Sequence, residues 1–327
     1  MYKKDKPMAL RSSTSALCNN LSVFMSNEKG MIHYSSVHKS VVNMVSTSAD
    51  GTSVNHRQVL CKEPSATHCS PMILQAKLID LPSRSLLVIC SQRGIQIFEA
   101  DGTVMLFWYA IDTNATAEAT YARGICNVGD NILCVGTYQG KILVFNLPFR
   151  GTNITLMETI KAHKAGITDL ASEGNKLVSS DDLGNINIWE YSGDSNEFEE
   201  VGRISGSGSP CNSLDIWQDS ILAGYGSGHL RVFSASTGIM GAEASAHARL
   251  VTSVHIAKNC GLALSTSEDS FVRVWQLSAG KVPQISHKFH ECVPDMQLQG
   301  GRFVSPDGGA FCVTGYDSNE LIFFACP

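Results

Sequence analysis

The feature that most constrains the fold of this chain is a repeat of short apolar segments, each of which ends in an aromatic residue. The segments are GIQIF, KILVF, NINIW, HLRVF, FVRVW and ELIFF, ending at Phe98, Phe145, Trp189, Phe233, Trp275 and Phe323. Consecutive aromatics are separated by 47, 44, 44, 42 and 48 residues. A period of about 40–45 residues is typical of architectures in which each repeat is one small β-sheet.

Each aromatic segment follows a turn-forming cluster and another apolar run, which indicates a strand, a tight turn and a second strand. In SLLVICSQRGIQIF, for example, the cluster CSQRG separates two apolar runs. Gly, Asn and Asp in such clusters supply the positive φ that tight turns need. The runs are rich in β-branched and aromatic residues and lack a helical period. The pattern therefore predicts an all-β propeller built from four-stranded blades.

Six repeats account for the chain from about residue 72 onward, and the first 60 or so residues hold enough short apolar runs for a divergent seventh blade. We therefore expect residues 16–327 to form a single closed ring of seven blades. The expected blades are approximately residues 16–70, 71–112, 113–158, 159–200, 201–243, 244–282 and 283–327.

The last repeat stops almost directly after its aromatic strand, so it needs a fourth strand from elsewhere in the chain. We expect a strand from the N-terminal region to supply it and close the ring, with NNLSVFM, residues 19–25, as one candidate, because closure removes two exposed sheet edges. Residues 1–15 carry Lys3, Lys4, Lys6 and Arg11, and we expect them to be a flexible basic tail.

Charge and composition exclude several classes of function. The formal net charge is -5, with 30 acidic residues against 25 basic ones, which argues against nucleic acid as a partner. No apolar run approaches the roughly 20 residues that span a bilayer, so we expect no transmembrane segment, while peripheral membrane or vesicle association stays open. Eleven cysteines without a C-x-x-C pair or a signal peptide predict reduced thiols in the cytoplasm.

The sequence offers no convincing cofactor or metal site. The motif GTYQGKI departs from a phosphate-binding loop at Ile142, and there is no G-x-S-x-G elbow for a nucleophile. His68 with Cys69 and Cys61, and His290 with Cys292, lack the paired spacing of a zinc site. We therefore predict no cofactor, no metal and no catalytic residue.

The segment STSEDSFVRVW places Ser, Asp and Trp together, with His247 a little upstream, so it could represent either a catalytic group or architecture. Two stretches resemble the WD-repeat family: AHARLVTSV through FVRVW, and AHKAGITDL through NINIW. Each has Ala-His in place of the usual Gly-His. The resemblance implies a structural hydrogen-bonded tetrad of His247, Ser265, Asp269 and Trp275. In such a tetrad the hydroxyl is buried, so the architectural interpretation is favoured.

Two further repeats match this tetrad in part. His163, Ser179 and Trp189 fit, but Leu183 occupies the usual Asp position, so Asp182 could complete the network only through a shifted turn. In the last repeat the matching residues are His290 and Asp317, whereas Phe323 and Val313 replace Trp and Ser.

These observations favour a non-catalytic scaffold that binds other proteins. Tyr and Arg dominate binding hot spots, so the candidate partner-binding residues are Arg123, Arg249, Tyr138, Tyr225 and Tyr316. The alternative for each tyrosine is packing between blades. The resemblance implies a cytoplasmic or vesicle-associated protein that self-associates and serves growth-factor signalling of the ERK type.

Two other functions are alternatives to the scaffold. One is a propeller hydrolase with a site at the channel mouth. The other is a substrate receptor of a ubiquitin ligase, which is disfavoured because EYS and QLS, and not Asp-x-Arg, follow Trp189 and Trp275.

Overall fold

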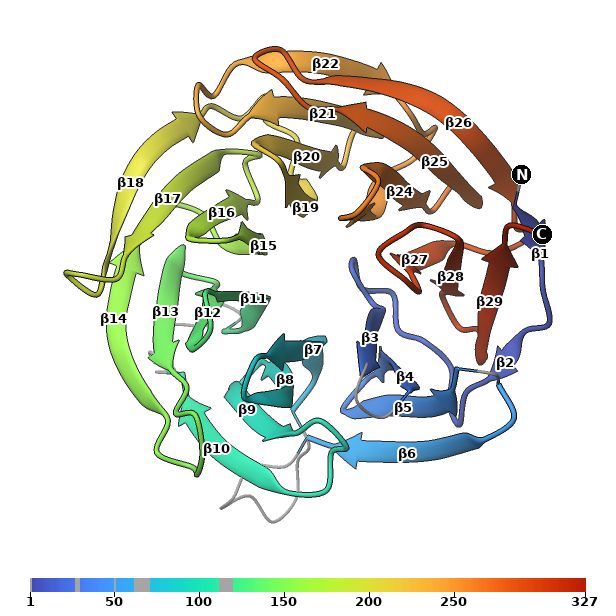
Figure 1. The fold of residues 1–327 in the computed structure, drawn as a ribbon, viewed down its shortest axis with the longest axis horizontal. Helices are drawn as coiled ribbons and strands as arrows, with labels where there is room; N and C mark the ends of the chain where they lie inside the picture. Colours follow the sequence, from blue (N-terminus) through green and yellow to red (C-terminus); the bar gives the residue numbers. More distant parts are fainter. Residues whose placement is uncertain (1, 27–29, 50, 62–70, 112–119) are drawn as a thin grey trace.

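The computed structural model describes residues 2–26, 30–49, 51–61, 71–111 and 120–327. These residues form 29 strands and no helix, and the strands are arranged as seven sheets around a common centre (Figure 1). The seven-bladed β-propeller predicted from the repeat is confirmed.

The strands follow one another outward in each blade, from an inner strand to the rim. The first blade contains β3 (Ser22–Ser26), β4 (Met31–His38), β5 (Val41–Ser48) and β6 (Val54–Leu60). The second contains β7 (Ile73–Leu81), β8 (Arg84–Ser91), β9 (Gly94–Glu99) and β10 (Met105–Ala110). The third contains β11 (Ala122–Val128), β12 (Ile132–Thr137), β13 (Lys141–Asn146) and β14 (Thr155–Lys161).

The remaining blades repeat this order. The fourth contains β15 (Ile167–Glu173), β16 (Lys176–Asp181), β17 (Ile186–Ser192) and β18 (Glu197–Ile204). The fifth contains β19 (Cys211–Trp217), β20 (Ser220–Tyr225), β21 (His229–Ser234) and β22 (Met240–Ser245). The sixth contains β23 (Val251–Ala257), β24 (Leu262–Ser267), β25 (Phe271–Ser278) and β26 (Gln284–Cys292). The seventh contains β27 (Leu298–Phe303), β28 (Ala310–Gly315) and β29 (Glu320–Ala325), together with β1 (Lys3–Lys4) and β2 (Met8–Ala9).

The core lies between neighbouring blades, which explains why the middle strands are apolar on both faces. Every residue of β12 and of β20 is buried, whereas most of the rim strand β14 is exposed. One apolar cluster, for example, joins Ile95 and Ile97 of the second blade to Val135 and Phe145 of the third. Burial of apolar side chains from two sheets at once is the main stabilising term of such a ring.

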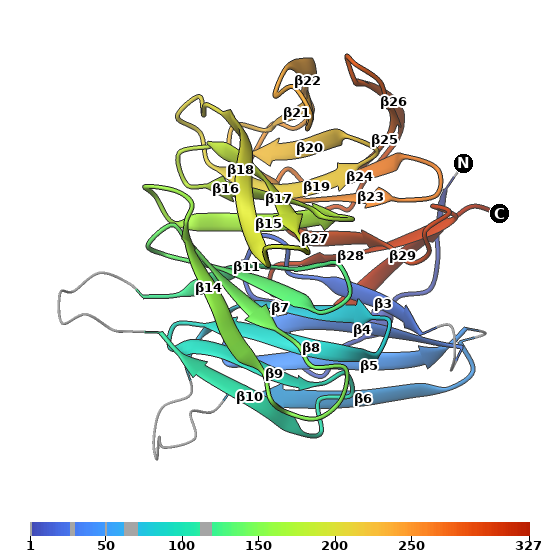
Figure 2. The ribbon, with the colours of Figure 1, turned by 60° about the vertical axis from the view of Figure 1, so that its left-hand side comes forward.

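The ring closes through β1 and β2, and not through the candidate segment, residues 19–25. Both short strands run antiparallel to β29, with Lys3 opposite Ala325 and Met8 opposite Leu321. The two ends of the chain therefore lie side by side in both views (Figures 1 and 2). Residues 19–25 instead begin the first blade as the inner strand β3 and the segment before it.

The expectation of a flexible tail at residues 1–15 is also wrong for the described residues of that segment. The ring of Tyr2 packs against Phe289 and Phe311 at centroid distances of 5.3 and 4.8 Å, and Leu10 is buried. Residues 3–7 are exposed, whereas Tyr2 and Met8 are half-buried, and the backbone of β1 and β2 covers the edge of β29.

The boundary expected at residue 283 differs from the observed one. Strand β26 pairs with β25 along its whole length, so it completes the sixth blade. The last blade is left with three strands of its own, and this is why it takes its outer strand from the start of the chain.

Candidate functional site

The four residues of the expected tetrad form one continuous series of hydrogen bonds. The indole N–H of Trp275 donates to the Ser265 hydroxyl at 2.9 Å, and that hydroxyl lies 2.8 Å from Nε2 of His247. Nδ1 of His247 lies 3.1 Å from the Asp269 carboxylate. Ser265 is 0% exposed, so its hydroxyl is committed to structure and cannot reach a substrate. The group fastens a strand to a turn, which is an architectural role.

The charges in this tetrad follow from its burial and its hydrogen bonds. Burial lowers the pKa of His247, although the neighbouring Asp269 acts in the opposite direction, and a neutral ring can accept the Ser265 proton at Nε2. Burial alone would raise the pKa of Asp269. Hydrogen bonds from His247 and from the backbone N–H groups of Ala248 and Phe271 outweigh it and lower that pKa to about 2.

A second complete tetrad occurs in the fourth blade, and its carboxylate comes from Asp181. Nδ1 of His163 lies 3.0 Å from Asp181, Nε2 lies 2.8 Å from the Ser179 hydroxyl, and Trp189 donates to that hydroxyl at 3.1 Å. The sequence left open whether Asp182 completes the tetrad, and in the structure Asp181 completes it instead. Asp181 ends β16, and its carboxylate also caps the turn by accepting the backbone N–H groups of Leu183 and Asn185.

The structure does not bring His290 and Asp317 together. His290 lies on the exposed strand β26 of the sixth blade, beside Phe271 and His287. Asp317 lies in the turn between β28 and β29, where its backbone N–H donates to Thr14. The two residues are apart because β26, which carries His290, belongs to the sixth blade, whereas Asp317 belongs to the seventh. The blade boundary expected at residue 283 was misplaced for the same reason.

The candidate partner-binding residues are in different environments. Arg249 is exposed in the connection before β23, and Tyr316 is 52% exposed in the turn after β28. Arg123 in β11 and Tyr138 after β12 are half-buried. Tyr225 is only 1% exposed, and the Arg231 guanidinium covers its ring at 4.6 Å from the centroid. The packing alternative therefore describes Tyr225, which is not available to a partner.

Sequence reasoning missed a plug in the central channel, formed by residues 16–21. The side-chain amide of Asn19 donates to Asp169 at 2.9 Å, and the Ser213 hydroxyl donates back to Asn19 at 2.7 Å. The backbone N–H of Asn19 donates to Thr252, and that of Asn20 donates to Gln299. Asn19 has φ = 58°, which Asn tolerates better than most residues. The plug thus ties the start of the first blade to four other blades.

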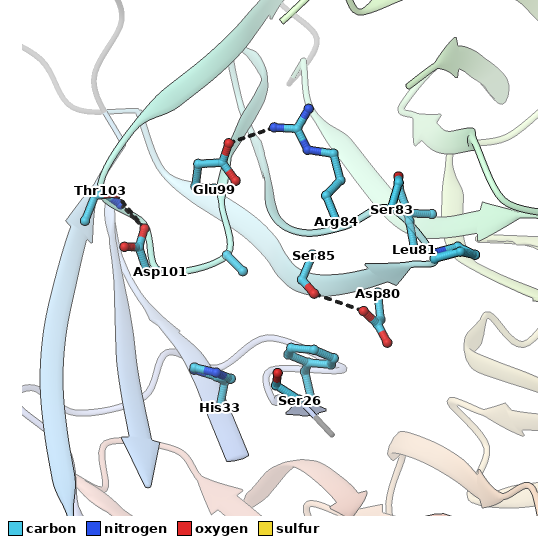
Figure 3. Close-up of a pocket in the computed structure, with 13 residues that line it drawn as sticks. Ser26, His33, Asp80, Leu81, Ser83, Arg84, Ser85, Glu99, Asp101 and Thr103 are labelled. Atoms are coloured by element: carbon cyan, nitrogen blue, oxygen red, sulfur yellow. Dashed lines mark hydrogen bonds and ion pairs between the residues drawn. The ribbon is translucent and has the colours of Figure 1, made fainter. Parts of the chain in front are cut away.

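A groove with a volume of about 630 Å³ lies between the first two blades. It is lined by residues of β3 and β4 and by the β7–β8 and β9–β10 connections (Figure 3). Phe24 and His33 stack in it with ring centroids 5.7 Å apart, and Leu81 and Pro82 add further apolar surface.

Three carboxylates and one guanidinium line the same groove. Glu99 accepts from Arg84 at 2.7 Å, whereas Asp80 accepts from a neutral group, the Ser85 hydroxyl, at 2.9 Å. Asp101 is exposed at the β9–β10 turn, where it accepts from Thr103. The groove, which we call the acidic groove, therefore has a formal charge of about -2 with an aromatic floor.

A second pocket of about 340 Å³ continues the acidic groove toward the third blade. It shares Pro82 and Ser83 with the groove, and it adds Asp130 and the 67% exposed Phe149. Connections inside a blade alternate between the two faces of the ring. The β7–β8 and β9–β10 connections therefore lie on the face opposite to the turns that carry Asp181 and Asp269.

Within the residues that the structure describes, no three His, Cys, Asp or Glu side chains gather as a metal site. His68 and Cys69, two of the ligands considered from the sequence, lie outside the described residues. The described residues also contain no helix that is long and apolar enough to cross a membrane.

Comparison with known sequences decides the family. The profile of the WDR54 family matches residues 1–326. The chain belongs to the WDR54 family. It is 39% identical to mouse WD repeat-containing protein 54 and 38% identical to the human protein of that name, over 99% of each chain. The rat protein called WD repeat domain 54 is also 38% identical, again over 99% of both chains.

Solved structures show the same fold for this WDR54-family chain at much lower identity. A chain in the crystal structure of a mitotic checkpoint complex superposes with a TM-score of 0.75 and 16% identity, covering 99% of this chain and 92% of the other. The WD40 repeats of RRP9 superpose with a TM-score of 0.73 and 14% identity, covering 99% of both. WD-repeat propellers generally act as protein-interaction scaffolds, so membership of the WDR54 family supports that class of function.

Proposed function

We propose that this WDR54-family propeller is a non-catalytic scaffold that holds a basic, extended segment of a partner protein in the acidic groove. The observation that carries the proposal is the groove itself, because it combines the stacked rings of Phe24 and His33 with three carboxylates and one guanidinium across two rigid blades. Rigid sheets on both sides let a partner bind without an ordering cost to the propeller.

The chemistry of the groove selects its occupant. Asp80 and Asp101 are exposed, and Asp80 accepts from the neutral Ser85 hydroxyl, so Lys or Arg side chains of a partner would complement the acidic lining of the groove. An apolar side chain of the same segment would lie against Phe24 and Pro82. Aromatic contact supplies affinity, and the carboxylates select for basic partners.

The cellular setting of this scaffold is part of the proposal. We place it in the cytoplasm or on vesicles, in growth-factor signalling of the ERK type, with self-association. The support for this setting is the resemblance to the WD-repeat family described above. Exposed residues of the opposite face, Arg249 and Tyr316, are second candidates for partner contact.

The binding test uses the purified full chain and a short labelled peptide in which Arg and Leu alternate. A counterpart with Glu in place of Arg controls for charge, and fluorescence anisotropy measures both. We expect only the Arg peptide to bind. The double variant Asp80→Asn/Asp101→Asn should weaken it about fivefold, since exposed ion pairs contribute modestly.

The matched control is Asp194→Asn, which removes an exposed carboxylate from the β17–β18 turn, outside the groove. It should leave the affinity of the Arg peptide unchanged. Equal binding of the two peptides, or equal loss in all variants, would contradict the proposal. Proximity labelling in cells with the groove variant and with Arg249→Ala then shows which face the cellular partners use.

A further inference from the structure

The central channel holds a cavity of about 200 Å³ that none of the preceding arguments uses. Its lining is regular, because the fifth residue of each of six inner strands faces it. These residues are Lys77, Cys126, Ala171, Asp215, His255 and Arg302. Lys258 and Asp169 also line the cavity.

Cations outnumber carboxylates in this cavity. Lys77, Lys258 and Arg302 face Asp169 and Asp215, which gives a formal charge of about +1 in a chain whose net charge is -5. A positive interior inside an acidic protein draws anions inward along the channel.

Both carboxylates already have partners. Asp215 accepts from the Lys258 ammonium at 2.6 Å and from the backbone N–H of Ile256 at 2.7 Å. Asp169 accepts from Asn19 at 2.9 Å and from the backbone N–H of Leu214 at 2.8 Å. These carboxylates are therefore committed to the walls of the cavity, and they leave cationic donors for another acceptor.

The unused donors belong to Lys77 and Arg302. Among the described residues, Lys77 donates only to the carbonyl of Ile125, at 2.8 Å, although an ammonium has three N–H groups. The hydrogen bonds that Arg302 makes with described residues all come from Nη1, which leaves Nε and Nη2. Nδ1 of His255 accepts from the backbone N–H of Phe303, so a neutral ring carries its proton at Nε2 as a further donor.

The plug lies toward one end of the channel. The contacts of Asn19 are at the second and third residues of inner strands, such as Asn212, Ser213 and Thr252. The cationic residues are at the fifth positions or beyond, further along the inner strands. The cavity is therefore displaced from the plug toward the face that carries the acidic groove, and we expect a ligand to enter from that face.

We propose that this cavity binds a small phosphate-bearing molecule through Lys77, Arg302 and His255. Arg and Lys donors suit a phosphate, whose oxygens accept several charge-assisted hydrogen bonds at once. The volume is below the range of about 300–1,000 Å³ that drug-sized ligands need, so it fits a phosphate with few further atoms. This site goes beyond the docking function proposed above and does not depend on it.

The test titrates the full chain with inorganic phosphate at constant ionic strength, with chloride as the balancing anion, and follows the melting temperature. A ligand that binds the native state raises it in a saturable way. Glycerol 2-phosphate tests a phosphomonoester, and an aspartate amide tests an acidic side chain. We expect both phosphates to act, and Lys77→Gln to weaken each about tenfold, whereas Lys77→Arg retains binding.

The matched control is Lys176→Gln, because Lys176 is a partly buried lysine that pairs with Asp219 at 3.0 Å on the outside of the ring. It should bind phosphate like the wild type. Line broadening of the phosphorus resonance by wild-type protein provides a readout that does not depend on the folding of any variant. Absence of broadening, equal effects of chloride, or preference for the aspartate amide would overturn the assignment.

Discussion

The side-chain amide of Asn19 lies 2.9 Å from the carboxylate of Asp169, although 150 positions separate the two residues in the sequence. Asn19 also accepts from the Ser213 hydroxyl at 2.7 Å, so one residue bridges the inner strands of the fourth and fifth blades from inside the channel. A ring of seven sheets is held mainly by contacts between neighbours. The plug adds contacts between blades that are not adjacent.

Replacement of Asn19 should therefore destabilise the whole ring. Asn19→Gly removes the side chain and leaves Ser213 and Asp169 with fewer partners, at a cost of about 2–3 kcal/mol. Asn19→Ala should cost about 1 kcal/mol more, because φ = 58° is unfavourable for a residue with a Cβ. Urea unfolding of the two variants measures both terms. Wild-type stability of Asn19→Gly would show that the bridge contributes nothing.

The second tetrad gives a matched pair of neighbouring aspartates. Asp181→Asn should destabilise the fourth blade by about 2 kcal/mol. The carboxylate accepts from His163 at one oxygen and from the turn at the other, whereas an amide has only one oxygen that can accept. Asp182→Asn should change stability by less than about 0.5 kcal/mol, since among the described residues the Asp182 carboxylate accepts only from the Tyr121 hydroxyl, at 3.4 Å. Equal losses in the two variants would contradict this assignment.

The fate of these two aspartates shows what the sequence can predict. The resemblance to the WD-repeat pattern located His163, Ser179 and Trp189, which the structure brings together. The carboxylate comes from the turn or its edge, and its position differs between the two tetrads although Ser and Trp are 10 residues apart in both. Here Asp181 reaches His163 from the end of β16, and Gly184 in the same turn has φ = 82°. Turn geometry was the part that the repeat could not specify.

Long-range pairing was equally hard to predict. The repeat predicted the blades because each sheet pairs strands that are adjacent in sequence. The closing strand is chosen from distant segments, and two candidates, residues 19–25 and residues 2–10, can each offer a short extended piece. The structure selects the second, because Tyr2 and Leu10 bury apolar surface beside β29. No local sequence pattern predicted either the plug or the charged cavity.

Removal of residues 1–9 should therefore expose the edge of β29 and lower stability. The truncated chain loses the pairing of β1 and β2 and the packing of Tyr2, and its open edge favours association with other sheets. We expect a lower melting temperature and larger species in size-exclusion chromatography with light scattering. Lys3→Ser/Lys4→Ser keeps the strands without their charge and should behave like the wild type. A monodisperse truncated chain of unchanged stability would contradict this account of closure.

Acid should destabilise the ring partly through His255. Burial, with the nearby Arg302, Lys258 and Lys77, lowers the pKa of His255 to about 3, although Asp215 acts in the opposite direction. The unfolded chain takes up this proton near its ordinary pKa of about 6.5, and the native state does not. Stability from this group is therefore complete above pH 6.5 and is lost as the pH falls toward 3, with a slope of up to about 1.4 kcal/mol per pH unit.

His255→Asn tests this directly, because its side-chain oxygen can accept the Phe303 N–H in place of Nδ1. Urea unfolding between pH 7 and pH 4 should show a shallower loss of stability in this variant than in the wild type. The loss of stability should not disappear, because the pKa of His247 is also lowered, chiefly by burial. Protonation of this second histidine in the unfolded chain also reduces stability as the pH falls. Asn19→Gly, which is destabilised without losing an imidazole, controls for lower stability as such. If its slope and that of His255→Asn both equalled the wild-type slope, the proton would have to bind elsewhere.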